Sequence, residues 1–549
     1  MSAVTPASSS DFSSDQPSVG DVWKGIQAFL APFASLKLTV VLFLFSIWLI
    51  LVGTLAQAEM NMWEVMKQYF RSVFAWMEFK HLVPLSFFPN RPDWIRGGMY
   101  IPGGLMLGGL LALNLLAAHI SRFKVQAKGS RLWTGLAVIA LGAFLTTLVV
   151  LGGHNSSGLQ GKPLLGWDQL WMLIRYALCV VWVGSVVLIL VLDRKPLLRF
   201  VSLIVLSAIL GVAAVYLLAT GDTTRLGDSS LRILWQLIQG GAAGIILLVG
   251  CVMVFKKRGG IVLIHAGVGL LMLGELLVGV GAIEEQITLV EGQSTQFARD
   301  TREIEIAVID RSPADHDHVT VIPAAYLKDG KSISHESLPF DIDVVEFLKN
   351  ANLRPPKPND VNPATAGAGL SLLADPARSS GGAEADQAVD IGAVYVKVTP
   401  KLAGADSQTY LLAQHFGDSD VLLRSRPAPV PETVTVGDKE YDLLLRFKRN
   451  YKPYTITLKD VSKDDYIGTS TPKDYSSWVS LTDSSRNFTR DKIRIWMNNP
   501  LRYAGETFYQ SGYNNDGGEE STTLQVVTNR GWMIPYVACM LALVGLAYH

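Results

Sequence analysis

Long apolar runs constrain this chain more than any other feature. A helix needs about 20 apolar residues to cross the hydrocarbon core of a bilayer. Seven runs of that length precede residue 282, and an eighth lies at the end of the chain. We place them at 36–56, 99–119, 132–152, 169–192, 198–219, 233–255, 261–281 and 531–549. The chain is therefore expected to be an α-helical membrane protein with about eight spans.

The overall composition agrees with lipid as part of the surroundings. Only 17% of the residues are charged, whereas soluble domains carry nearer a quarter. The formal net charge is zero, so we expect no nucleic-acid partner. Three cysteines, Cys179, Cys251 and Cys539, each lie inside an apolar run, and the chain has no CxxC or CxxCH pattern. This excludes covalent c-type haem and dithiol chemistry in the chain itself.

Lys and Arg in the short loops predict the orientation, because positive loops stay in the cytoplasm. One set of loops is rich in them and the alternate set is poor. The rich set contains Arg122, Lys124, Lys128, Arg131, Arg194, Lys195, Arg199, Lys256, Lys257 and Arg258. We therefore expect a multi-pass protein of the cell (inner) membrane with a cytoplasmic amino terminus. Residues 1–35 form a disordered cytoplasmic tail in this interpretation, since they begin with a Ser- and Asp-rich stretch that has no basic signal-peptide region.

Residues 282–530 follow the seventh span and are expected to form a large extracytoplasmic domain. Alternation of apolar and polar residues recurs in EIEIAVID, DIDVVEF, AVYVKVTP and KIRIWMNN, which begin at residues 303, 341, 393 and 492. This period of two predicts half-buried antiparallel strands and hence a β-rich sheet or sandwich. Residues 351–390 are rich in Pro, Gly and Ala, and we expect a flexible insertion there. Residues 531–549 then form a final, slightly short span.

Histidines within or beside the spans are the main candidates for chemistry. His265 lies inside the seventh span, about seven residues beyond Arg258 and thus in its cytoplasmic half. An ionisable side chain at that depth suggests a functional site, and imidazole is a common axial ligand of haem iron. The alternative is a histidine bonded to a neighbouring helix. His119 at the cytoplasmic end of the second span and His154 at the outer end of the third are weaker candidates. His316 and His318 are expected in a solvated turn.

Other motifs point less clearly to a site. Glu275 is in the same span as His265, but about 15 Å further along the helix; it could pair with Arg175 or carry protons. The aromatic stretch 166–176, which contains Asp168, is either an interfacial belt or a platform facing haem. No hydrolase, kinase or nucleotide-binding signature is present. The glycine-rich segments 103–109 and 267–274 lie in spans, where glycine allows helices to approach closely.

Four segments together resemble the ResB family of the system II cytochrome c maturation pathway. They are ASLKLTVVLFLFSIWLILVGTLAQ at 34–57, MWEVMKQYF with LLALNLLAAHISRFK at 62–70 and 110–124, the His265-containing 258–293, and MNNPLRYAGETFYQSGY at 497–513 followed by the last apolar run. The final block is the most specific. The resemblance weakens between 132 and 255 and across 351–390.

The resemblance implies a function in haem handling. Such a protein pairs with a ResC/CcsA-type membrane protein, exports haem and helps attach it to the CxxCH cysteines of apocytochrome c. The family's membrane histidine corresponds to His265, which would bind haem b transiently as one axial ligand, with the partner supplying the other. His119 is the weaker cofactor-binding candidate, and no metal is expected except through haem iron at His265. No complete active site is expected in this chain, so whether it is itself an enzyme stays open.

Several points stay open within this interpretation. The chain is either half of a two-protein synthase or a fragment of a fused polypeptide. The outer domain would present apocytochrome c or brace the partner. Four aromatic residues near its end are candidates for an exposed surface or for packing of the last strands: Tyr503, Phe508, Tyr509 and Tyr513.

Two other functions compete with haem handling. The first is a polytopic transporter or sensor with an outer ligand-binding domain, in which Glu275 and Arg175 form the working pair. The second is a scaffold subunit that only stabilises its partner, in which case His265 would be dispensable.

Overall fold

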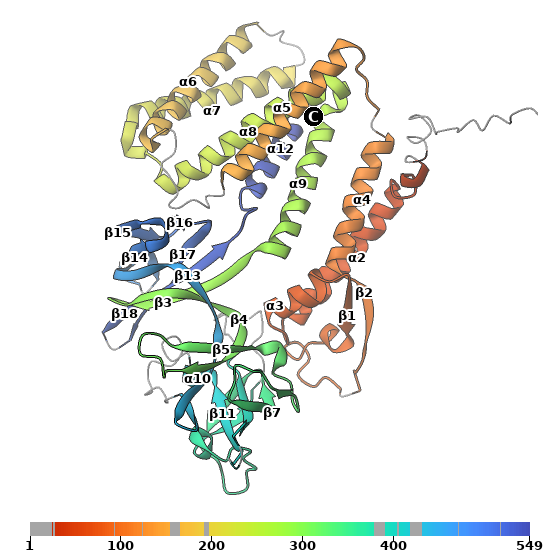
Figure 1. The fold of residues 1–549 in the computed structure, drawn as a ribbon. Helices are drawn as coiled ribbons and strands as arrows, with labels where there is room; N and C mark the ends of the chain where they lie inside the picture. Colours follow the sequence, from red (N-terminus) through yellow and green to blue (C-terminus); the bar gives the residue numbers. More distant parts are fainter. Residues whose placement is uncertain are drawn as a thin grey trace, which may run out of the picture.

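The computed structural model describes residues 25, 28–92, 94–122, 124–153, 165–191, 197–377, 390–402, 404, 406–417, 431–469, 471–516 and 518–549. A layer of long helices lies beside a large body of strands (Figure 1). The chain enters the β body after α9 and returns from it into the last helix, α12.

Eight helices correspond to the expected spans. They are α2 (Leu36–Ala56), α4 (Gly104–Arg122), α5 (Ser130–Gly152), α6 (Trp167–Val191), α7 (Leu197–Thr220), α8 (Asp228–Phe255), α9 (Gly259–Gly281) and α12 (Ile534–Tyr548). Six described stretches are long and apolar enough to cross a membrane, and the sixth, Asp228–Gly281, contains both α8 and α9. Helix α12 is apolar but shorter. The expected fold class, membrane helices with a large β-rich domain, is confirmed.

A sharp turn separates α8 from α9. Lys256 has a φ of 53° and begins a short 3-10 helix that ends at Arg258. The next residue, Gly259, lies against the backbone of Val252, where an added Cβ would be 2.7 Å from the Val252 nitrogen. A side chain at this position would therefore force the two helices apart, and glycine allows the reversal.

The second span begins later than its hydropathy suggests. We expected it at 99–119, but Gly98–Pro102 form strand β2, which pairs with β1 (Phe74–Glu78). Pro102 explains the difference, because a proline disfavours the helical conformation in the residue before it. The helix therefore begins at Gly104, after the proline.

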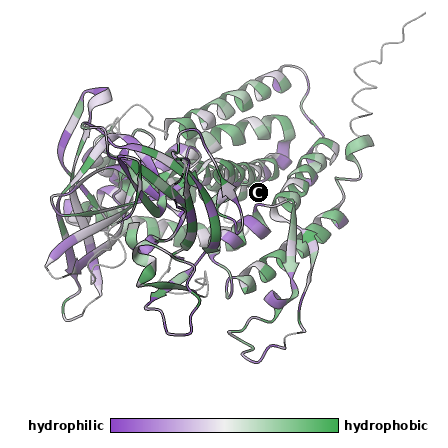
Figure 2. Cartoon of the chain, turned by 60° about the horizontal axis from the view of Figure 1, so that its bottom comes forward, coloured by the Kyte–Doolittle hydropathy of each residue, from purple (hydrophilic) through white to green (hydrophobic). Residues whose placement is uncertain are grey.

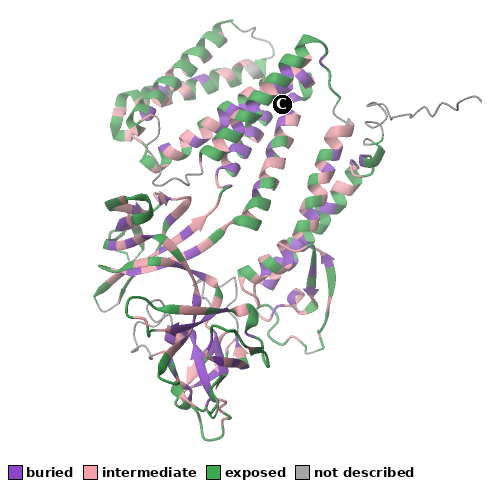
Figure 3. Ribbon diagram, viewed as in Figure 1, coloured by how far each residue is buried: buried purple, intermediate pink, exposed green. Residues whose placement is uncertain are grey.

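Many apolar side chains of the helices point away from the protein. Leu198 and Val280 are both 82% exposed, and Val212 is 73% exposed. Hydrophobic residues dominate the helices in Figure 2, and the outer helices α6 and α7 are largely exposed in Figure 3. Such surfaces require a lipid environment. The chain is therefore a membrane protein.

Two antiparallel sheets make up most of the β body. The strands are β3 (Ile283–Val290), β4 (Ser294–Asp310), β5 (His318–Pro323), β6 (Ser332–Ile333), β7 (Phe340–Leu348), β8 (Ala351–Arg354), β9 (Leu373–Pro376), β10 (Ala393–Pro400), β11 (Gln408–Ala413), β12 (Glu432–Val436), β13 (Lys439–Asp465), β14 (Pro472–Asp483), β15 (Phe488–Trp496), β16 (Leu501–Tyr503), β17 (Glu506–Asp516) and β18 (Glu519–Thr528). The larger sheet has the order β15-β14-β13-β4-β3-β18-β17-β16, with β12 beside β13 and β5 beside β4. The smaller has the order β11-β10-β7-β6.

Two hydrophobic cores hold these sheets. The first lies between the β4–β13 pair and the smaller sheet and includes Ile306, Leu445, Ile342 and Val396. The second lies within the larger sheet and includes residues of β3, β13, β14, β16, β17 and β18. Strand β10 is buried on both faces, since Val394 and Tyr395, on opposite faces, are both almost fully buried. Its alternating pattern therefore does not indicate a half-buried strand.

The expected flexible insertion 351–390 is structured over much of its length. Strands β8 and β9 pair with each other, and Leu373 and Ala374 are buried against Leu411 of the smaller sheet. Arg354 forms ion pairs with Asp360 and Asp375. Its Pro, Gly and Ala content predicted flexibility, but ion pairs and buried side chains, rather than periodic strands, hold the described part of the segment in place. Residues 378–389 lie outside the described part of the chain.

The connection between α2 and α4 lies on the same side as the β body. Trp63, in the short helix α3 (Met62–Val65), has the guanidinium of Arg302 4.9 Å from its ring centre. Glu64 forms an ion pair with Lys349. These contacts join the first pair of spans to the large domain.

Candidate functional site

Two of the sequence candidates, His119 and His265, meet where α4 and α9 approach each other. The Nδ1 of His265 lies 3.0 Å from the Nε2 of His119. The ring centres are 4.7 Å apart and the ring planes are almost perpendicular, at 89°. Both side chains are half-buried. The structure thus brings the stronger and the weaker haem-ligand candidates into one site.

Helix α4 is held firmly just before His119. The side-chain amide of Asn114 donates hydrogen bonds to the carbonyl oxygens of Phe33 and Ser35, and its oxygen accepts one from Thr39. Ala117 is completely buried in a cluster with Leu30 and Ala34. A polar side chain in lipid is stabilised by such bonds across helices. These hydrogen bonds of Asn114 and the packing of Ala117 fix the last turns of α4, and with them the position of His119.

Helix α9 is positioned by close packing on its opposite face. Gly260, Gly267 and Gly274 are spaced by seven residues and therefore share one face of the helix. An added Cβ at any of them would come within 2.8 Å of α12 or the residues at its ends. His265 is two residues from Gly267, a rotation of about 200°, so it points to the other side, toward α4. The expectation that glycine allows close helix packing is confirmed for 267–274, but not at Gly108 and Gly109 of the segment 103–109, where an added Cβ would meet no atom within 4 Å.

The hydrogen bonds define which nitrogens carry protons when both rings are neutral. The Nδ1 of His119 lies 2.8 Å from the carbonyl oxygen of Leu115, so this nitrogen donates. Its Nε2 is then the acceptor, and the Nδ1 of His265 must donate to it. This tautomer places the lone pair of His265 on Nε2, which is the arrangement of a metal-ligating histidine whose other nitrogen is held by a hydrogen bond.

The geometry fits one metal–imidazole bond better than two. Each such bond is about 2 Å long, so two histidines on opposite sides of one iron need about 4 Å between nitrogens, compared with the 3.0 Å observed. Ligation by His265 alone, with His119 orienting it, requires no such movement. Within the described residues, no group of three or more His, Cys, Asp or Glu side chains could form a metal cage.

Glu275 and Arg175 do not form the pair considered from the sequence. Arg175 bonds to Asp222 across a distance of 3.2 Å. Glu275 is exposed on α9 and has no hydrogen-bond or ion-pair partner in the described part of the chain. The transporter or sensor interpretation therefore loses the pair on which it depended.

The remaining sequence candidates are accounted for by packing or lie outside the described residues. Trp171 is buried with Leu231, and Asp168 bonds to Arg225, so the aromatic stretch is used in helix packing. His316 is exposed and bonds to Asp315. His154 lies outside the described residues.

Packing also explains most of the aromatic block near the end of the domain. Tyr503 and Phe508 are buried in the second core, whereas Tyr509 is 39% exposed. Sequence reasoning missed the arginine in this block, Arg502, which lines a cavity together with Tyr509. The sequence signal for this site was an arginine in an otherwise largely apolar and aromatic block, between Pro500 and Tyr503.

Comparisons with known proteins agree with the resemblance. Residues 433–522 match the model of the ResB-like family. The chain is also 30% identical over 118 residues to Protein NrfI of Wolinella succinogenes, a match that covers 22% of this chain and 13% of that protein. The family match runs from β12 into β18 and includes the block 497–513, while both histidines lie outside it.

Proposed function

We propose that this membrane protein, whose residues 433–522 belong to the ResB-like family, binds haem at His265 during cytochrome c biogenesis. The observation that carries the proposal is the hydrogen-bonded pair of His265 and His119 between two membrane helices. Haem is the substrate here, held transiently before it is attached to the CxxCH cysteines of apocytochrome c.

The two histidines have different roles in this proposal. His265 donates its Nδ1 proton to His119 and presents Nε2 to the iron. His119 in turn donates to the Leu115 carbonyl oxygen and so keeps its acceptor nitrogen aimed at His265. A hydrogen bond to the distal nitrogen of a ligating histidine fixes the ring and raises its basicity. His265 is the ligand and His119 a positioning residue.

The depth of the histidine pair in the membrane agrees with transport of haem from the cytoplasm outward. With the amino terminus in the cytoplasm, the histidine pair lies in the cytoplasmic half of the membrane, close to Lys256, Lys257 and Arg258. These cations would attract the carboxylates of haem. The β body would then lie outside, where it would present apocytochrome c or brace the partner. A ResC/CcsA-type partner would supply the second axial ligand and the attachment chemistry, for which this chain has no complete set of residues.

The test is the visible absorption spectrum of the full-length protein purified with any haem it retains. We expect a haem spectrum in the native protein and its loss in His265→Ala. His119→Ala should retain haem with a weakened or shifted spectrum, because the ligand remains but its orientation is lost. His316→Ala is the matched control, since this histidine is exposed and lies between β4 and β5 of the β body. Haem binding that is indifferent to His265 would contradict the proposal and favour a scaffold function.

A further inference from the structure

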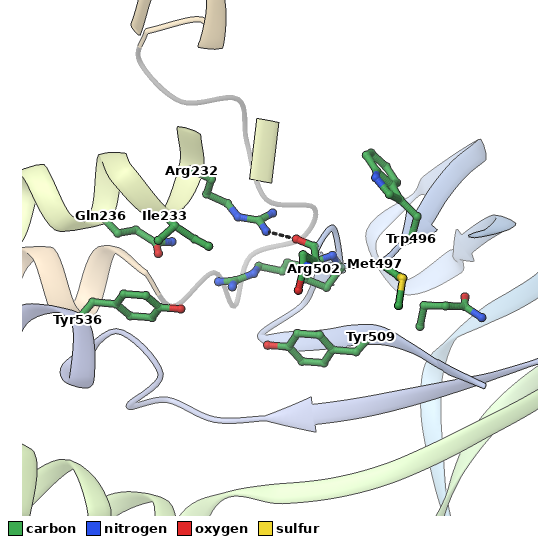
Figure 4. A pocket seen from close by; sticks show the side chains of 11 residues that line it. Arg232, Ile233, Gln236, Trp496, Met497, Arg502, Tyr509 and Tyr536 are labelled. Carbon is green, nitrogen blue, oxygen red and sulfur yellow. Dashed lines mark hydrogen bonds between the residues drawn. The ribbon is translucent and has the colours of Figure 1, made fainter. Parts of the chain in front are cut away.

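A cavity of about 310 Å³ lies where the membrane helices meet the β body. Its walls come from the first turns of α8 and α12 and from the segment that links β15 to β17 (Figure 4). Arg232 and Gln236 enter from α8, Tyr536 from α12, and Trp496, Arg502 and Tyr509 from the β body. Most of the wall from the β body belongs to the block 497–513.

The two arginines in this cavity have few partners for their donor groups. The Nε and Nη1 atoms of Arg502 are buried and have no hydrogen-bond acceptor within the described residues. Its guanidinium carbon lies 3.6 Å from the ring centre of Trp532, which fixes the plane of the group. Arg232 donates one hydrogen bond, 2.7 Å long, to the carbonyl oxygen of Asn498 (Figure 4).

No carboxylate from the described residues lines the cavity to balance these charges. None of the residues that line the cavity is Asp or Glu. Burial, together with the positive charge of Arg232, lowers the pKa of Arg502 to about 10. Arg446 provides a contrast, because it is even more deeply buried but forms an ion pair with Glu305 at 2.9 Å. A buried cation without a counter-charge is costly, so the donors of this cavity favour an anionic ligand.

We propose that this cavity binds the phosphate group of an anionic phospholipid. The planar fork of arginine matches phosphate oxygens, and the hydroxyls of Tyr509 and Tyr536 supply further donors. Trp532 shortly precedes α12 and Tyr536 lies in its first turn, and aromatic residues of this kind mark the headgroup level of a membrane. The volume lies at the lower end of the roughly 300–1,000 Å³ of ligand pockets, enough for a headgroup. This proposal does not depend on haem binding.

The test uses the full-length protein in a non-ionic detergent and follows tryptophan fluorescence, because Trp532 and Trp496 contact or line the site. Three probes are titrated separately: phosphatidylglycerol, inorganic phosphate, and diacylglycerol, which has the acyl chains without phosphate. We expect a saturable response to phosphatidylglycerol. Its dissociation constant should increase by about tenfold or more in Arg502→Gln, since charge-assisted hydrogen bonds are lost.

Further variants make the outcome decisive. Arg232→Gln should weaken binding in the same way, and it replaces Arg502→Gln if that variant does not fold. Arg502→Lys, which keeps the charge without the fork, should be intermediate. Arg311→Gln removes an exposed arginine elsewhere on the domain and should bind normally. An equal response to inorganic phosphate would retain the phosphate site but overturn the lipid as its source. An equal response to diacylglycerol, or binding unchanged in Arg502→Gln and Arg232→Gln, would overturn the proposal.

Discussion

The packing of α9 on α12 should control the histidine site from its far side, and Gly267→Ala tests this. A Cβ at Gly267 would lie 2.7 Å from the carbonyl oxygen of Ala538 and 3.0 Å from the nitrogen of Ala542. A comfortable carbon–oxygen contact is about 3.3 Å, so the two helices must separate by about 0.6 Å. Because His265 is on the opposite face, this movement pushes it toward His119, from which it is already only 3.0 Å away.

The expected energy follows from the same geometry. Overpacking a well-packed contact costs roughly 1–3 kcal/mol, while replacing glycine by alanine within a helix returns about 0.5–1 kcal/mol. We therefore expect a net loss of up to roughly 2.5 kcal/mol for Gly267→Ala. A larger loss should follow for Gly267→Leu, together with reduced haem binding although neither histidine is changed.

The assay is the thermal unfolding midpoint of the purified full-length protein, with the visible spectrum recorded on the same samples. Gly108→Ala in α4 is the matched control, because its added Cβ meets no atom within 4 Å. This variant should be neutral or stabilised and should keep the native spectrum. If Gly267→Ala and Gly108→Ala behave alike in both measurements, the argument that α12 sets the position of His265 is wrong.

Three further predictions concern the outer parts of the protein and the membrane charges. Burial lowers the pKa of His81, in the connection between α2 and α4, below 6.5. The unfolded state therefore takes up the proton first as the pH drops, and the free energy of unfolding should decrease below about pH 6.5. His81→Gln should flatten this part of the pH profile of the unfolding midpoint, and an unchanged slope would contradict the prediction. Glu305→Gln should cost about 3–5 kcal/mol because it leaves Arg446 buried without its partner, and adding Arg446→Met should recover most of the loss in thermal unfolding. Effects of Arg175→Gln and Glu275→Gln on stability should add within about 0.3–0.5 kcal/mol, as expected for residues without contact; a larger coupling energy would revive the transporter interpretation.

Hydropathy predicted the membrane helices well because lipid imposes a single simple requirement on every span. The first span, 36–56, coincides with α2, whose surroundings need only be apolar. Where backbone geometry competes with hydropathy, the prediction failed. Residues 99–102 are apolar but precede or include Pro102, and they form a strand. Pro102 could have predicted this strand, because a proline disfavours the helical conformation in the residue before it. The prediction followed hydropathy instead.

The candidate site was predicted in its parts but not as a unit. His119 is three residues from the end of α4 and His265 six residues from the start of α9, which places them about 4.5 and 9 Å from helix ends on the same expected side of the membrane. Similar depth permits contact, but which helices are neighbours depends on tertiary packing. The hydrogen bonds of Asn114 and the contact of α9 with α12 determine that α4 and α9 are neighbours. The Arg502 cavity was missed for the same reason, since three segments distant in sequence form it.

The most direct measurement of the proposed function is chemical rescue of His265→Ala during cytochrome c maturation. The full-length protein would be expressed with its ResC/CcsA-type partner and a reporter cytochrome carrying one CxxCH motif, and covalently attached haem would be measured with and without added imidazole. We predict that His265→Ala abolishes attachment, that imidazole restores a substantial part of it, and that imidazole has no effect on the native protein. Normal attachment by His265→Ala without imidazole would contradict a ligand role for this histidine.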